Sequence, residues 1–156
     1  MRIFTIAGWS NSGKTTLIIK LIKELKKKGL KVMALKNASE KYYLEPEGKD
    51  SLNFLQAGAD SVFLSSKKEL MKMELIADKN RLFEKLEIEF EKYDIILLEG
   101  LIKEGIPIIE VYNSENNKLK FKEKDLYAII SDNYKISKTP CFKRDEIDKI
   151  ITLLMN

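Results

Sequence analysis

Short apolar runs alternate along the chain with longer segments of helical periodicity. The apolar runs predict strands at residues 3–7, 31–36, 61–65, 93–100 and 126–130. The segments with helical spacing predict helices at residues 15–28, 50–57, 80–92 and 145–155. Four consecutive apolar residues at 95–98 are typical of a strand buried on both faces at the centre of a parallel sheet. This order of elements predicts a three-layer α/β fold with a mainly parallel sheet.

Two further apolar segments, residues 106–112 and 118–121, flank a polar turn at 113–117. They predict an antiparallel hairpin that extends the sheet. Pro107 has no N–H group, so we expect this hairpin near an edge or a bulge, where an exposed strand would offer a route to a dimer. Residues 69–77 fit either a strand or a helix.

The first predicted strand leads into the stretch Gly8-Trp9-Ser10-Asn11-Ser12-Gly13-Lys14-Thr15-Thr16 and then into a helix. Its spacing, G-x-x-x-x-G-K-T between a strand and a helix, is that of a phosphate-binding loop. Gly8 and Gly13 allow a tight turn and a close approach of backbone amides to phosphate oxygens. The Lys14 ammonium is expected on the β and γ phosphates, and the Thr15 hydroxyl on a magnesium ion.

The alternative interpretation is a polar turn followed by an ordinary helix, with Lys14 in solvent. A lysine at a helix N-terminus is slightly unfavourable unless an anion is present. The strand before the loop and the helix after it are also the context that the motif needs. The sequence therefore favours nucleotide binding.

Three carboxylates are candidates for the same site. Glu99 ends the central strand, where it could hold the magnesium ion through a water molecule. Asp50 is either the N-cap of a short helix or a carboxylate near the magnesium ion. Asp132 follows the strand at 126–130 and is either a turn residue or an acceptor for the N1–H and 2-amino groups of guanine.

Composition limits the remaining possibilities. The 156 residues fit one domain, 1–156, and the absence of histidine excludes histidine metal ligands and serine–histidine catalysis. Cys141 is the single cysteine, which excludes an intrachain disulfide and indicates a reducing compartment; we expect it to be buried. The net charge of +4 is spread along the helices, so no nucleic-acid partner is expected. A first strand at the N-terminus and no apolar run of ~18 residues predict a cytoplasmic protein without a signal peptide or membrane span.

The ordered set of stretches resembles the molybdopterin-guanine dinucleotide biosynthesis protein B family nearly end to end. The matching stretches are residues 6–17, 34–36, 48–51, 57–59, 94–100, 106–111 and 130–132, followed by the helix from Asp145. The phosphate loop is shared by many NTPases. The order of Gly-Lys-Asp-Ser, Glu-Gly and Ile-Glu-Val is more particular to this family.

The resemblance implies the fold of phosphate-loop NTPases and a GTP-binding homodimer with at most weak GTPase activity. Its partner would be the guanylyltransferase that joins GMP to molybdopterin, and molybdopterin is a further candidate ligand. GTP would lie at Gly8, residues 10–16 and Asp132, and Mg²⁺ at Thr15, Asp50 and Glu99. One departure is Asn37, because the family usually has a histidine after the lysine of the second strand.

Two other functions are compatible with a phosphate loop. The first is an ATP-using small-molecule kinase or ligase, which usually needs arginines around the phosphates. The chain has only Arg2, Arg81 and Arg144, none of them in an expected active-site loop. The second is a nickel or cobalt metallochaperone, for which one cysteine and no histidine provide few soft ligands.

Overall fold

The computed structural model of the chain describes residues 2–38, 49–76, 78–116, 118–134 and 138–156. The chain divides into two compact units. The first unit comprises Met1–Asn37 and Glu89–Asn156, and the second comprises Ala38–Ile88. The expected single domain over 1–156 stays a prediction.

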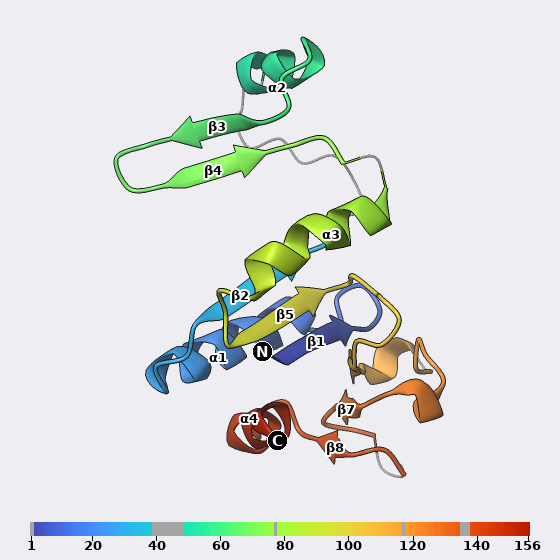
Figure 1. Ribbon diagram of the computed structural model, residues 1–156. Helices are drawn as coiled ribbons and strands as arrows, with labels where there is room; N and C mark the ends of the chain where they lie inside the picture. Colours follow the sequence, from blue (N-terminus) through green and yellow to red (C-terminus); the bar gives the residue numbers. More distant parts are fainter. Residues whose placement is uncertain (1, 39–48, 77, 117, 135–137) are drawn as a thin grey trace. The chain divides into compact units, whose positions relative to one another are not determined.

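The first unit contains a six-stranded sheet in which every strand is parallel to its neighbours (Figure 1). From one edge to the other, the strands are β2 (Val32–Lys36), β5 (Ile95–Glu99), β1 (Arg2–Ala7), β6 (Ile108–Val111), β7 (Ala128–Ile130) and β8 (Cys141–Phe142). The predicted α/β class with a mainly parallel sheet is confirmed. The short strand β8 is an element that the apolar pattern did not predict.

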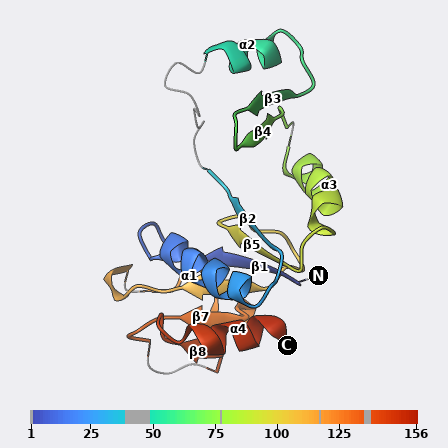
Figure 2. The same ribbon diagram turned by 90° about the vertical axis from the view of Figure 1, so that its left-hand side faces the viewer.

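Helices α1 (Lys14–Lys27) and α4 (Ile147–Met155) pack against each other and on one face of this sheet (Figure 2). The helices bury leucines and isoleucines spaced three and four residues apart, as amphipathic helices do. The opposite face of the sheet is also shielded from solvent at its centre, since Ile96, Leu98 and Ile129 are fully buried. No helix among the described residues is long and apolar enough to cross a membrane.

The second unit contains helix α2 (Lys49–Gln56) and a two-stranded antiparallel sheet of β3 (Val62–Ser65) and β4 (Leu70–Met73). Helix α3 (Lys79–Phe90) begins in this unit, and its last two residues belong to the first. The antiparallel hairpin of the fold is therefore β3–β4. It includes part of the segment 69–77, for which the sequence left strand and helix open.

The hairpin predicted at residues 106–121 is wrong. Strand β6 lies inside the sheet, parallel to β1 and β7, and the carbonyl of Pro107 accepts a hydrogen bond from Thr5 N–H at 2.9 Å. Residues 118–121 form an irregular segment, which follows the 3₁₀ turn Ser114–Asn116 and precedes a second turn, Glu123–Asp125. Pro107 is tolerated although β6 lies inside the sheet, because the proline precedes the first residue of the strand.

Cys141 is exposed on β8, so the expectation of a buried cysteine is also wrong. The edge position of β8 explains this, because only its neighbour β7 covers it within the sheet.

Helix α1 offers a test of the core. Leu21 is fully buried, whereas Ile19, two residues before it, is 47% exposed. Leu21→Ala should lower the free energy of unfolding by about 2–5 kcal/mol, because it removes buried methyl groups and leaves a cavity. Ile19→Ala should cost less than about 1 kcal/mol. Urea denaturation of both variants measures the difference, and equal losses would contradict this packing of α1.

Candidate functional site

The carboxyl ends of the parallel strands lie at one edge of the sheet, and the candidate residues follow them there. The strand order reverses at β1, which has β5 on one side and β6 on the other. Ligands of open α/β sheets bind outside the carboxyl ends of the strands at such a reversal. The loop from Gly8 to Gly13 leaves β1 at this point and enters α1.

The loop needs glycine at both ends. Gly8 has φ of 139°, and a Cβ on it would clash with the carbonyl oxygen of Val111 at the end of β6. Gly13 has φ of 93° and occupies the N-cap position of α1. No side chain caps this helix end, and its first turn has no acidic residue. The N–H groups at the start of α1 therefore suit an anion.

Lys14 turns back onto the loop. Its Nζ donates to the carbonyl of Trp9 at 2.7 Å, and the same carbonyl accepts Ser12 N–H at 3.3 Å. Burial lowers the pKa of Lys14; Glu99 opposes this shift, while Lys120 and Lys36 add to it. The Ser12 hydroxyl is buried and has no hydrogen-bond partner among the described residues. A buried hydroxyl without a partner, in the same loop as the Lys14 ammonium, fits a loop that encloses an anion.

Thr15 and Glu99 are brought together by the pairing of β1 with β5, in which Ile6 lies opposite Glu99. The Thr15 hydroxyl lies 3.0 Å from each carboxylate oxygen of Glu99. Lys36 Nζ lies 3.9 Å from one of these oxygens. A hydroxyl and a carboxylate are hard oxygen donors, which is the ligand type that Mg²⁺ prefers.

Asp50 lies in the first turn of α2, in the second unit, and its side chain is exposed. Its expected place beside Thr15 and Glu99, which belong to the first unit, stays a prediction. Within the described parts of the chain, no three acidic or cysteine side chains form a cluster that could hold a metal by themselves. A magnesium ion on Thr15 and Glu99 would complete its coordination with water and phosphate oxygens.

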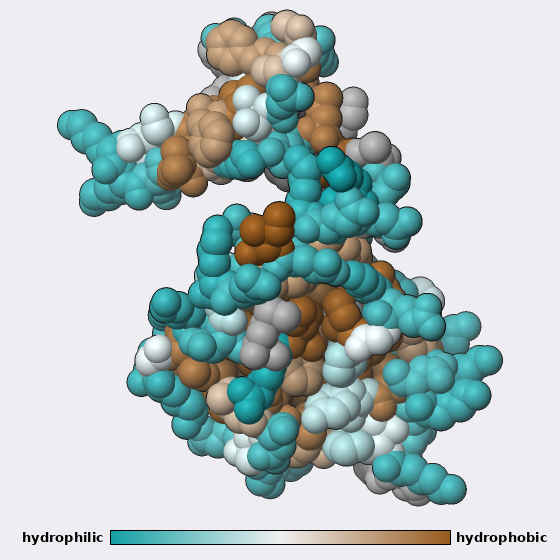
Figure 3. All heavy atoms as spheres, viewed as in Figure 1, coloured by the Kyte–Doolittle hydropathy of each residue, from teal (hydrophilic) through white to brown (hydrophobic). Residues whose placement is uncertain are grey.

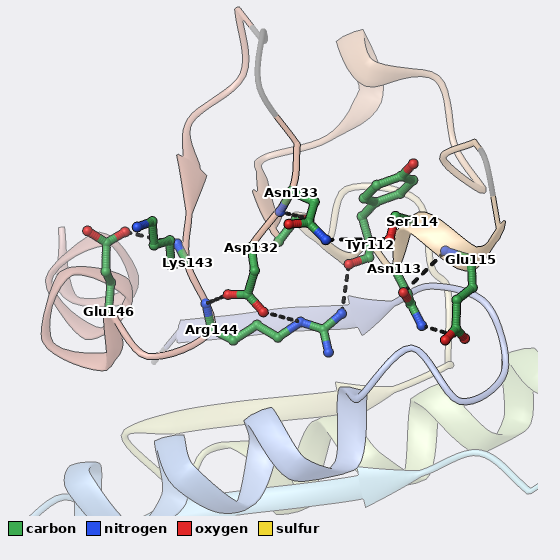
Figure 4. A network of polar contacts seen from close by, with 10 residues as sticks. Tyr112, Asn113, Ser114, Glu115, Asp132, Asn133, Lys143, Arg144 and Glu146 are labelled. Carbon is green, nitrogen blue, oxygen red and sulfur yellow. Dashed lines mark hydrogen bonds and ion pairs between the residues drawn. The ribbon is translucent and has the colours of Figure 1, made fainter.

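Asp132 follows β7 and lies against Arg144, which follows β8 (Figure 4). Arg144 N–H donates to Asp132 Oδ1 at 3.2 Å, and Arg144 Nε lies 3.5 Å from Oδ2. Arg144 Nη2 donates to the carbonyl of Tyr112 at 2.8 Å. On its other side the guanidinium approaches the phosphate loop, because a Cβ placed on Gly13 would lie 3.0 Å from Nη1. Arg144 thus links the loops that follow β1, β6 and β7.

The expectation that no arginine lies in the active-site loops is corrected by Arg144. It was missed because β8 has only two residues and gives no visible strand pattern. Once β8 is known to be parallel to β7, the residues after it must lie at the same edge as Asp132.

Asn37, which stands where the resembling family usually has histidine, supports the end of β5. Its N–H donates to the carbonyl of Glu99 at 2.9 Å, and its Nδ2 lies 3.4 Å from the carbonyl of Gly100. The residue therefore contributes to the local structure beside Glu99.

A parallel sheet that presents a glycine-bounded loop, a lysine and a threonine at its strand reversal defines a phosphate-loop protein of the nucleotide-binding type. The family model described as Molybdopterin guanine dinucleotide synthesis protein B matches residues 3–132. The chain belongs to this family.

Two relatives share the match. The chain is 33% identical over 132 residues to the molybdopterin-guanine dinucleotide biosynthesis adapter protein of Haemophilus influenzae, covering 83% of this chain and 73% of that protein. It is 31% identical over 113 residues to the protein of the same name from Escherichia coli, covering 70% and 65% respectively.

Solved structures agree on the fold. Superposition with the crystal structure of Bacillus subtilis MobB gives a TM-score of 0.74 at 26% identity, over 99% of this chain and 98% of that one. A MobB homologue from Bacillus stearothermophilus gives 0.67 at 22% identity, over 100% and 97%.

The phosphate loop can be tested through Gly8. Gly8→Ala combines a positive φ with a clash against the Val111 carbonyl. Gly29 also has a positive φ, of 79°, but a Cβ built on it would meet no atom within 4 Å. Gly29→Ala should cost about 1–2 kcal/mol from strain alone. Gly8→Ala should cost at least ~1 kcal/mol more, because β6 must also shift. Chemical denaturation compares the two, and an equal cost would contradict the close approach of the loop to Val111.

Proposed function

We propose that the chain is a GTP-binding adapter protein of molybdenum cofactor biosynthesis. In this proposal it assists the guanylyltransferase that joins GMP to molybdopterin. The observation that carries the proposal is the phosphate loop with Lys14, Thr15 and Glu99 at the strand reversal, in a chain of this family. Its magnesium dependence, homodimer and cytoplasmic location are parts of the proposal.

The loop residues support the nucleotide site. The α1 N-terminus offers its N–H groups to a phosphate, and Lys14 exchanges the Trp9 carbonyl for phosphate oxygens. The buried Ser12 hydroxyl supports the same assignment, since a bound polyanion supplies acceptors inside the loop. A magnesium ion would neutralise phosphate charge between Thr15 and Glu99. Asp50 stays a predicted part of that magnesium site.

Asp132 supports the choice of guanine. Its side chain is 54% exposed, and each carboxylate oxygen retains lone pairs beside its contact with Arg144. Guanine presents two adjacent donors, N1–H and the 2-amino group, which a carboxylate can accept together. Adenine has no donor at these positions, so Asp132 discriminates between the two bases.

The names of the relatives support the adapter function over phosphoryl transfer by a kinase or ligase, because both are called adapter proteins of molybdopterin-guanine dinucleotide biosynthesis. The partner is accordingly the guanylyltransferase of that reaction. Molybdopterin as a further ligand stays a prediction, with no residue assigned to it.

The second unit supports a homodimer. Phe63 and Leu70 lie on the same face of the β3–β4 hairpin, and they are 58% and 70% exposed. Hydrophobic residues also gather on the surface of this unit in Figure 3. The large hydrophobic residues that are exposed among its described residues are Phe54, Phe63, Leu70, Met71, Leu75 and Ile88. A two-stranded sheet is marginally stable alone, and a second copy would cover this face.

Calorimetric titration with GTP and ATP, each with Mg²⁺, tests the nucleotide assignment. The wild type should bind GTP more tightly than ATP. Lys14→Ala should weaken GTP binding by at least about tenfold, since a charge-assisted hydrogen bond contributes about 1.5–3 kcal/mol. Asp132→Asn should reduce the preference for GTP without weakening ATP binding.

Chelation of Mg²⁺ with EDTA serves as the control for the metal and should weaken GTP binding. Equal or tighter binding of ATP by the wild type would contradict guanine recognition and favour the kinase alternative.

Light scattering after gel filtration tests the homodimer. The wild type should have twice the 18.1 kDa mass of the chain. Phe63→Glu should shift the protein to the monomer, because it replaces the exposed ring, over which Lys72 lies, with a carboxylate that a second copy would have to bury. Ile19→Glu changes an exposed apolar residue of the first unit and should remain dimeric. A monomeric wild type would contradict the homodimer, and a dimeric Phe63→Glu would contradict this face as the contact.

A further inference from the structure

Residues 118–121 lie against the phosphate loop and contact it through Trp9. The indole Nε1 of Trp9 donates to the carbonyl of Lys118 at 3.1 Å. The ammonium of Lys120 lies over the same ring, 5.8 Å from its centroid, at a distance typical of a cation–π contact. The Trp9 side chain therefore connects residues 118–121 to the first half of the phosphate loop.

Glu110, on strand β6, accepts hydrogen bonds from the same segment. It lies on β6 inside the sheet and is fully buried, which is costly for a carboxylate unless it is hydrogen-bonded. Its two oxygens accept the backbone N–H of Lys120 at 2.6 Å and of Phe121 at 3.1 Å. Burial raises the pKa of Glu110, and the two backbone hydrogen bonds act against that rise. The carboxylate thus fixes the backbone from which the Lys120 side chain starts.

Two ammonium groups consequently converge on Trp9. Lys14 Nζ contacts its carbonyl and Lys120 Nζ its ring. Lys120 is close enough that its charge contributes to lowering the pKa of Lys14. Two like charges near one loop residue repel each other; Glu99 offsets part of this repulsion at Lys14, and a ligand with several negative charges would compensate for both ammonium groups.

We propose that Lys120 is a second nucleotide-binding lysine, which contacts the polyphosphate from the side of Trp9, and that Glu110 is its positioning residue. The inference rests on the proposed nucleotide site and adds a residue outside the phosphate-loop motif. Lys120 is exposed and lies on an irregular segment, so its side chain can turn from the indole ring toward a phosphate. Glu110 never touches the nucleotide and acts only through the backbone of residues 120 and 121.

The single tryptophan, Trp9, makes the proposal measurable by fluorescence. GTP titrations with Mg²⁺, followed by Trp9 emission and by calorimetry, compare the wild type with Lys120→Ala. The variant should bind GTP about tenfold more weakly and GMP nearly unchanged, because GMP lacks the β and γ phosphates. Lys120→Arg should keep most of the affinity. Lys118→Ala removes the same charge from the same segment but keeps the backbone carbonyl, and should change affinity less than about twofold.

The role of Glu110 is tested with Glu110→Gln. Without nucleotide, this variant should make Trp9 more accessible to acrylamide quenching, because the segment is released. Its GTP affinity should fall, but Glu110→Gln should add almost nothing in the Lys120→Ala background, since it acts through that lysine. Additive losses, or unchanged quenching in a folded Glu110→Gln, would overturn the positioning role.

Two results separate this inference from the proposed function. Wild-type affinity in Lys120→Ala, together with lost binding in Lys14→Ala, would overturn the second lysine and leave the nucleotide site intact. Equal losses in Lys118→Ala and Lys120→Ala would also overturn it, because they would reflect net charge alone. A wild type that binds no nucleotide would overturn both proposals.

Discussion

The parallel pairing of β1 with β5 and β6 is the constraint on which the candidate site depends. It brings the ends of three strands to one edge of the sheet, so that Glu99 on one side and Val111 on the other border the loop that leaves β1. The Val111 carbonyl comes so close to Gly8 that no side chain fits there. The position of Lys14 and Thr15 follows, because they begin the helix that the same loop starts.

Positively charged side chains surround the loop at this edge of the sheet, and few carboxylates in the described part of the chain lie near enough to pair with them. Glu99 is near both Thr15 and Lys36, and Asp132 forms an ion pair with Arg144. Lys14 Nζ and Arg144 Nη2 donate to the backbone carbonyls of Trp9 and Tyr112, while the buried Nε of Arg144 has no hydrogen-bond partner among the described residues. These contacts are of the kind that phosphate oxygens can replace, which is the electrostatic basis of the proposed nucleotide site.

Local sequence was sufficient where a feature depends on neighbours in the chain. The phosphate loop, the buried strand ending in Glu99 and the amphipathic helices α1 and α4 were all predicted from spacing and periodicity. The errors arose from contacts between distant residues. Residues 118–121 alternate like a strand, but the buried Glu110 takes two of their N–H groups, so they cannot pair as a hairpin. Arg144 was missed because its position follows from the two-residue strand β8.

In the proposed function, a nucleotide at the phosphate loop enables this chain to assist a guanylyltransferase. The most direct test is the rate at which the purified partner enzyme joins GMP to molybdopterin, measured with the wild type and with Lys14→Ala at saturating Mg²⁺. The wild type should raise this rate in the presence of GTP, and Lys14→Ala should not. The same rate with wild type, with Lys14→Ala and without either protein would contradict the proposed function.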